Sequence, residues 1–163
     1  MRKTKKTIKF RRRREGKTDY KKRLALIKSK ALRLVIRKTN TKIMAQLVEY
    51  QTPGDKVLVA IDSNSLKKYG WDKNTGNLSA AYLTGYLLGK KAQKKNIKRA
   101  ILDMGLIRPV KGSKIFACLK GVVDSGLDIS HNPKVFPTQE QIEGLKKDIK
   151  ETFKKVKTKV EQE

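Results

Sequence analysis

The chain has 163 residues, of which 41 are Lys or Arg and 15 are Asp or Glu, giving a formal net charge of +26 at pH 7. This length suits one domain with extensions, and the basic excess points to a polyanionic partner, with nucleic acid ahead of a membrane surface. The sequence lacks the roughly 18 continuous apolar residues of a membrane span and the apolar segment of a secretory signal. One cysteine and one histidine are too few for a usual zinc site, so we expect a cytoplasmic protein without metal, cofactor or membrane.

The first 30 residues carry much of the charge. They contain fifteen basic and two acidic residues, and "KFRRRREGKTDYKKR" (9–23) includes four adjacent arginines. So few apolar residues interrupt this run that we predict an extended arm over residues 1–20, disordered until it meets a partner. A short helix over 21–28 should follow it.

The pattern from residue 31 onward predicts an α/β body, in which three strands precede an alternation of helices and strands. The expected elements are strands at 31–39, 41–50 and 56–62, a helix at 78–96 capped by Asn77 or Ser79, a strand at 100–103, a helix at 112–126 and a short strand near 127. The first three strands, joined by short turns, form an antiparallel meander. This order favours an α/β sandwich on a mixed sheet and resembles the ribonuclease-H-like architecture.

Two helices carry further patterns. Small residues recur at helical spacing along the helix at 78–96, which predicts close approach to a sheet or another backbone; they are Ala81, Gly85, Gly89 and Ala92. From Gln139, after a Thr138 cap, one apolar face is formed by Ile142, Leu145, Ile149, Phe153, Val156 and Val160. We therefore divide the chain into an arm with a short helix (1–30), an α/β domain (31–137) and one amphipathic C-terminal helix (138–163) packed on or beside the domain.

The acidic residues argue against catalysis. Ribonuclease-H-like nucleases hold two metal ions with carboxylates, on the first strand, the first helix and the fourth strand. The strand at 31–39 and the helix at 78–96 contain no acid, and only Asp103 stands where a ligand could lie. We expect no catalytic residue, and a nuclease is the disfavoured alternative.

Binding of RNA fits the arm better. Arginine presents a planar fork of donors that suits phosphate oxygens, and exposed aromatic rings can stack on unpaired bases. Two further aromatic residues, Tyr69 and Trp71, could either stack on RNA or anchor their loop to the core. The arm alone would also suffice for a general nucleic-acid chaperone, which is the second alternative.

Three blocks resemble one known family: "FRRRREGKTDYKKRL" (10–24), "GNLSAAYLTGYLLGKKA" (76–92) and "ILDMGLIRPVKGSKIFACLKGVVDSGLDISH" (101–131). They are similar to the archaeal and eukaryotic branch of the large-subunit ribosomal proteins numbered eighteen in the universal series. The resemblance implies a non-catalytic protein that binds 5S ribosomal RNA and helps attach it to 23S ribosomal RNA in the central protuberance of the ribosome. It also implies neighbouring ribosomal proteins as partners, including the other protein of the 5S particle.

The first two matching blocks and Lys28, which follows the first block, supply the RNA-binding candidates. They are Phe10, Arg11, Arg12, Arg13, Arg14, Lys17, Tyr20, Lys21, Arg23, Lys28 and Asn77.

Overall fold

The computed structural model describes residues 7–144 and 146–162. The helices are α1 (Arg11–Arg14), α2 (Tyr20–Lys28), α3 (Leu78–Lys94), α4 (Lys114–Asp124), α5 (Gln139–Glu143) and α6 (Lys147–Glu161), with short 3₁₀ helices η1 (Ser63–Tyr69) and η2 (Pro133–Val135). The strands are β1 (Arg33–Lys38), β2 (Ile43–Glu49), β3 (Lys56–Asp62), β4 (Arg99–Asp103) and β5 (Asp128–Ile129).

The five strands form one mixed sheet in the order β3-β2-β1-β4-β5. The pairs β1–β2 and β2–β3 are antiparallel, whereas β1–β4 and β4–β5 are parallel. Short turns can join the antiparallel strands, but the parallel strands need the crossovers that α3 and α4 provide. The predicted meander and the mixed α/β sheet are confirmed.

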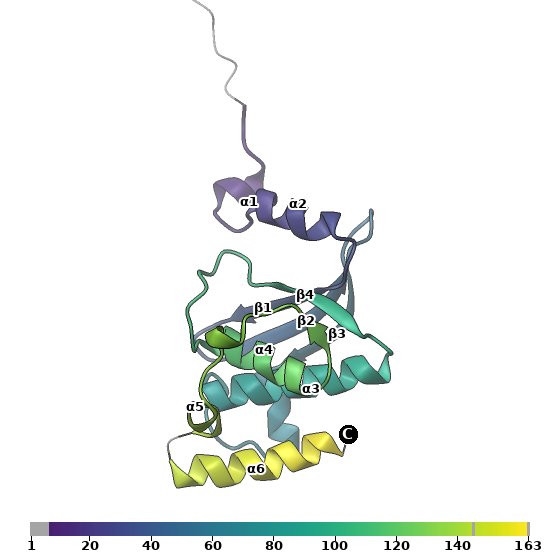
Figure 1. Ribbon diagram of the computed structural model, residues 1–163. Coiled ribbons are helices and arrows are strands. Elements are labelled where there is room, and N and C mark those ends of the chain that lie inside the picture. Colours follow the sequence, from purple (N-terminus) through teal and green to yellow (C-terminus); the bar gives the residue numbers. More distant parts are fainter. Residues whose placement is uncertain (1–6, 145, 163) are drawn as a thin grey trace, which may run out of the picture.

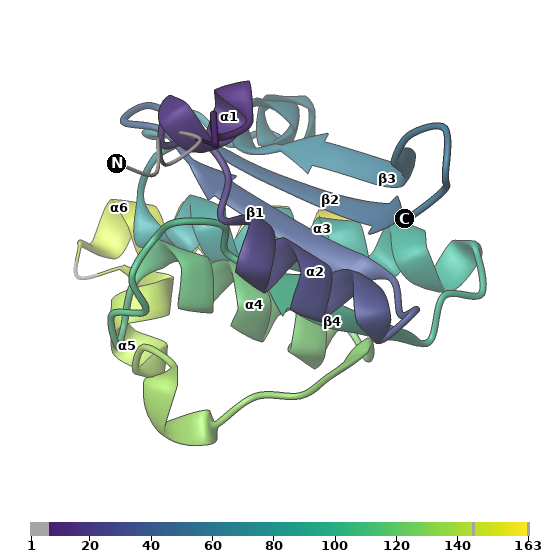
Figure 2. The same cartoon turned by 90° about the horizontal axis from the view of Figure 1, so that it is seen from above.

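The two faces of the sheet have different surroundings. Helices α3 and α4 cover one face, and α2 lies over the other (Figures 1 and 2). Side chains alternate along β1 accordingly: Leu34 and Ile36 are fully buried in the core beneath the sheet, while Arg33 and Arg37 belong to the face toward α2. This second face is the one that carries charged side chains.

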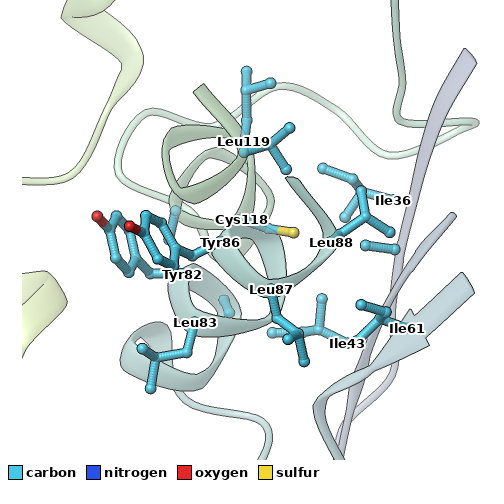
Figure 3. Packing of buried hydrophobic residues seen from close by; sticks show 14 of the residues in the cluster. Ile36, Ile43, Ile61, Tyr82, Leu83, Tyr86, Leu87, Leu88, Cys118 and Leu119 are labelled. Carbon is cyan, nitrogen blue, oxygen red and sulfur yellow. The ribbon is translucent and has the colours of Figure 1, made fainter. Parts of the chain in front are cut away.

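Small residues bring α3 and α4 together. A Cβ atom on Gly85 would lie 2.0 Å from the carbonyl oxygen of Cys118, and one on Gly121 would lie 2.1 Å from that of Tyr82. The predicted close approach is therefore to another helix rather than to the sheet. Leu87 and Leu88 of α3 then face the sheet residues across the core (Figure 3).

The single C-terminal helix that we predicted is wrong in one respect, because the segment forms two helices. Gly144, at φ +93°, ends α5, and α6 starts at Lys147. Leu145, which we placed on the apolar face, lies outside the described residues. Phe153, Val156 and Val160 of α6 are buried, and the Phe153 ring lies 5.7 Å from the Tyr82 ring of α3, so α6 packs on α3 as a further layer away from the sheet (Figure 1).

The extended arm also needs correction. Arg11 to Arg14 form one helical turn, because the Phe10 carbonyl accepts hydrogen bonds from the Arg13 and Arg14 amides at 2.9 and 3.0 Å. Gly16, at φ +61°, then turns the chain toward α2. The prediction for residues 1–6 falls outside the described residues, and the short helix expected at 21–28 is confirmed as α2.

Candidate nucleic-acid interface

The turn α1 presents its four arginines to solvent. All four side chains are exposed, and the one acid nearby, Glu15, forms ion pairs with Arg11 at 3.7 Å and Lys17 at 2.9 Å. The Nε atom of Arg12 donates a hydrogen bond to the Thr18 hydroxyl at 2.9 Å. Four like charges on one helical turn repel one another, so this arrangement favours a partner with several phosphate groups.

Two aromatic residues, Phe10 before α1 and Tyr20 at the start of α2, lie close together. The Phe10 and Tyr20 rings lie 5.4 Å apart at 43°, and Phe10 is 74% exposed. Asp19 precedes Tyr20 as the N-cap of α2, accepting from the Lys21 and Lys22 amides at 3.0 and 3.2 Å. An exposed ring beside a basic helical turn can stack on an unpaired base.

A chain of charges joins α2 to the sheet. Asp55, in the turn before β3, lies 2.9 Å from Arg23 Nη2 of α2 and 2.7 Å from Arg33 Nη2 of β1. The Arg33 contact is an ion pair without the alignment of a hydrogen bond. Every residue of α2, a helix that the structure describes in full, is half-buried or exposed, so Asp55 adds an ionic link to limited apolar packing.

The same arginines set the protonation of Asp55. Burial alone would raise the pKa of its carboxyl, but the close, positively charged guanidinium groups of Arg33 and Arg23 outweigh this effect and lower the pKa below the ordinary value of 3.8. A carboxyl group with a lowered pKa stabilises the folded state at pH values above its ordinary pKa. This stabilisation is lost as the pH falls through the lowered pKa. The link is therefore fully charged at neutral pH.

Further along the sheet, Asp103 at the end of β4 forms ion pairs with two arginines, which leaves one positive charge uncompensated within this group of three. It lies 3.4 Å from Arg33 Nη1 and 3.0 Å from Arg37 Nη2. Arg37 also donates to the Asp103 carbonyl at 2.7 Å, and the Gly105 amide donates to the Asp103 carboxylate at 2.8 Å. The one carboxylate at a nuclease-like position is thus occupied by internal partners.

A cleft of about 610 Å³ opens between the arm and the sheet, and we call it the arm cleft. Its walls include Arg12 of α1, Lys22 and Leu26 of α2, Arg37 of β1, Ile101 of β4 and Leu106 of the following loop. The cleft thus has basic side chains around an apolar interior. Its volume lies within the range of roughly 300–1,000 Å³ that is typical of small-molecule sites.

The structure brings most of the candidate RNA-binding residues together, since those from Phe10 to Lys28 all belong to the arm and α2. Asn77 stands apart: its side chain caps α3 by accepting from the Ala80 amide at 2.7 Å. Trp71 is 1% exposed and donates to the Asn74 carbonyl at 3.3 Å, while Tyr69 packs half-buried against the core. Trp71 therefore anchors its loop to the core.

Sequence reasoning missed Lys22, Arg37 and Asp55 as parts of this surface. Lys22 and Arg37 line the arm cleft, and Asp55 ties the arm to the body. One signal was present for Arg37, because charged residues at positions 33 and 37 of a strand must share one face. Asp55 offered none, since its partners are distant in sequence.

Within residues 7–144 and 146–162, no group of three or more His, Cys, Asp or Glu side chains could hold a metal ion. The helices of this same part of the chain include none long and apolar enough to cross a membrane.

Comparison with known proteins identifies the family. A family model described as "Ribosomal large subunit proteins 60S L5, and 50S L18" matches residues 4–98 and 90–132. Two curated relatives, each named "Large ribosomal subunit protein uL18", come from Korarchaeum cryptofilum and Methanococcus maripaludis and are 50% and 51% identical over 137 residues. Each alignment covers 84% of this chain, and 70% and 71% of the respective relatives. The chain belongs to this family, of the archaeal type, and is a non-catalytic structural constituent of the large ribosomal subunit.

Proposed function

We propose that this chain binds 5S ribosomal RNA and helps attach it to 23S ribosomal RNA in the central protuberance of the large subunit, beside the other protein of the 5S particle. The basic and aromatic side chains of the arm and α2, from Phe10 to Lys28, make the principal RNA contacts. The observation that carries this proposal is the exposed turn of four arginines that precedes α2, the helix that Asp55 links to the sheet.

The arrangement supports a positioned contact rather than a loose tail. A free basic tail neutralises phosphates without holding them in any register. Here the Arg23–Asp55–Arg33 link ties the arm to the body, so the arm and the body can engage one folded RNA together. Such a joint surface favours one RNA shape over others of equal charge.

A competition titration tests the proposal. The full chain is bound to labelled archaeal 5S RNA at about 150 mM salt, where exposed charges are strongly screened, and challenged with unlabelled transfer RNA. We expect 5S RNA to remain bound against roughly a hundredfold excess of competitor, a preference worth about 2.7 kcal/mol. Equal competition by transfer RNA would instead favour the general chaperone alternative.

A further inference from the structure

The arm cleft has an apolar interior and basic walls. Leu26 on the side of α2 and Ile101 on the sheet are both half-buried, and Leu106 of the loop after β4 is 49% exposed. Lys22 and Arg37 line the same space. A ligand that fits must combine a flat or apolar group with negative charge.

The two acids that line the cleft do not cancel its attraction for anions. Asp19 is engaged with the first amides of α2, and Asp103 forms ion pairs with Arg33 and Arg37. The other charged residues along the walls are basic: Arg12, Lys17, Lys22, Arg23 and Arg37. Ion pairs with Glu15, Asp55 and Asp103 compensate part of this charge, and the basic residues still outnumber the acids. An acidic peptide would match the charge, but a nucleotide matches the charge and places a planar base against the apolar interior.

We infer that the arm cleft takes an unpaired nucleotide of the bound RNA, with its base between α2 and the sheet and its phosphate at the basic walls. This inference rests on the proposed RNA-binding function and names the structural element of RNA that the site recognises. A duplex presents its bases stacked and paired, and proteins read it mainly through shape and backbone. A base from a loop or bulge can leave the stack and enter a cleft of this size. The protein should therefore bind folded RNA with unpaired bases more tightly than a plain duplex.

A pair of tryptophan variants on α2 tests the site without changing charge. Ala25 is exposed and lines the cleft, whereas its neighbour Leu24 is 54% exposed and does not belong to the lining. We expect Ala25→Trp to fill the cleft and weaken binding of archaeal 5S RNA about tenfold, while Leu24→Trp binds as the unmodified chain does. Affinity for a blunt RNA duplex of similar length should be the same for all three proteins, since its phosphate contacts remain.

Thermal unfolding of each variant establishes that it is folded, and ultraviolet crosslinking of the unmodified protein to 5S RNA gives an independent readout. Crosslinks within residues 101–107 would support base insertion, and their absence while the arm crosslinks would overturn it. Equal effects of both variants on RNA binding, or no effect of Ala25→Trp, would also overturn the inference. If Ala25→Trp bound 5S RNA normally but failed to enter large subunits, the inference would again be overturned, because the cleft would then hold a protein segment. If the unmodified chain itself shows no preference for 5S RNA over transfer RNA, that result contradicts the proposed function, whatever the two variants do.

Discussion

At the scale of single residues, glycine decides how closely α3 and α4 pack. Alanine favours a helix over glycine by about 1 kcal/mol, so helix propensity alone predicts that Gly85→Ala stabilises the protein. The geometry predicts the opposite, because the new Cβ would lie 2.0 Å from the carbonyl oxygen of Cys118, a backbone atom that cannot rotate away. We expect overpacking to lower the free energy of unfolding by roughly 1–3 kcal/mol, and the midpoint of thermal unfolding by about 2–4 °C for each kcal/mol of that decrease.

The matched control for this substitution is Gly54→Ala, in the turn before β3. Nothing lies within 4 Å of a Cβ at that position, so the stability should change by no more than about 0.5 kcal/mol. A Gly85→Ala protein as stable as the unmodified chain would mean that α3 and α4 can separate without loss of packing.

At the scale of elements, the position of α2 depends on Asp55. Replacing this acid by Asn removes a negative charge from an RNA-binding surface, and simple electrostatics then predicts tighter binding. We expect weaker binding instead, because Asp55→Asn removes the ion pairs to Arg23 and Arg33 and releases the arm from its position. Loss of one of the two carboxylate partners of the buried Arg33 should also cost about 1–3 kcal/mol of stability. Both effects can be measured in one preparation by titration with 5S RNA and by thermal unfolding.

Asp72→Asn controls for the change in charge. Asp72 has a side chain that is 64% exposed and pairs only with its neighbour Lys73 at 3.0 Å among the interactions described, so its loss should alter stability by at most about 0.5 kcal/mol. If Asp55→Asn bound RNA as tightly as Asp72→Asn does, the arm would not need the body for its position.

Elements whose two faces differ chemically could be predicted from the sequence. The meander was predicted from apolar runs separated by turns, and α4 from one apolar face; α3, which is buried on all sides from Ser79 to Gly89, was predicted from its apolar run and its cap. The predicted ranges agree with the structure within a few residues. The helical turn of the arm was missed, because four arginines have no apolar face and the bonds to the Phe10 carbonyl are local. The cleft was also missed, because Arg23 and Asp55 are 32 residues apart, and Arg33 and Asp103 are 70 apart, and pattern reasoning does not reveal such pairs.

At the scale of the whole molecule, the question is whether the net charge of +26 acts as a sum or by its placement. Two variants with equal loss of charge separate these cases. One changes the four arginines of α1 to Gln, and the other changes four exposed lysines of α6 to Gln: Lys147, Lys154, Lys155 and Lys159. If charge acted as a sum, both variants would lose the same affinity for 5S RNA.

We expect the two variants to differ, because counterion release counts only those cations that lie against phosphates. The slope of log affinity against log salt should become shallower by roughly 0.7–0.9 for each phosphate that the variant no longer neutralises, so by about 3 for the α1 variant if each arginine neutralises one phosphate. The α6 variant should keep the original slope, since that helix packs on α3, on the side of the molecule away from the arm (Figure 1). Equal slopes for both variants would contradict the placement of the RNA along the arm, and a shallower slope for the α6 variant alone would move the principal RNA contact to the C-terminal helix.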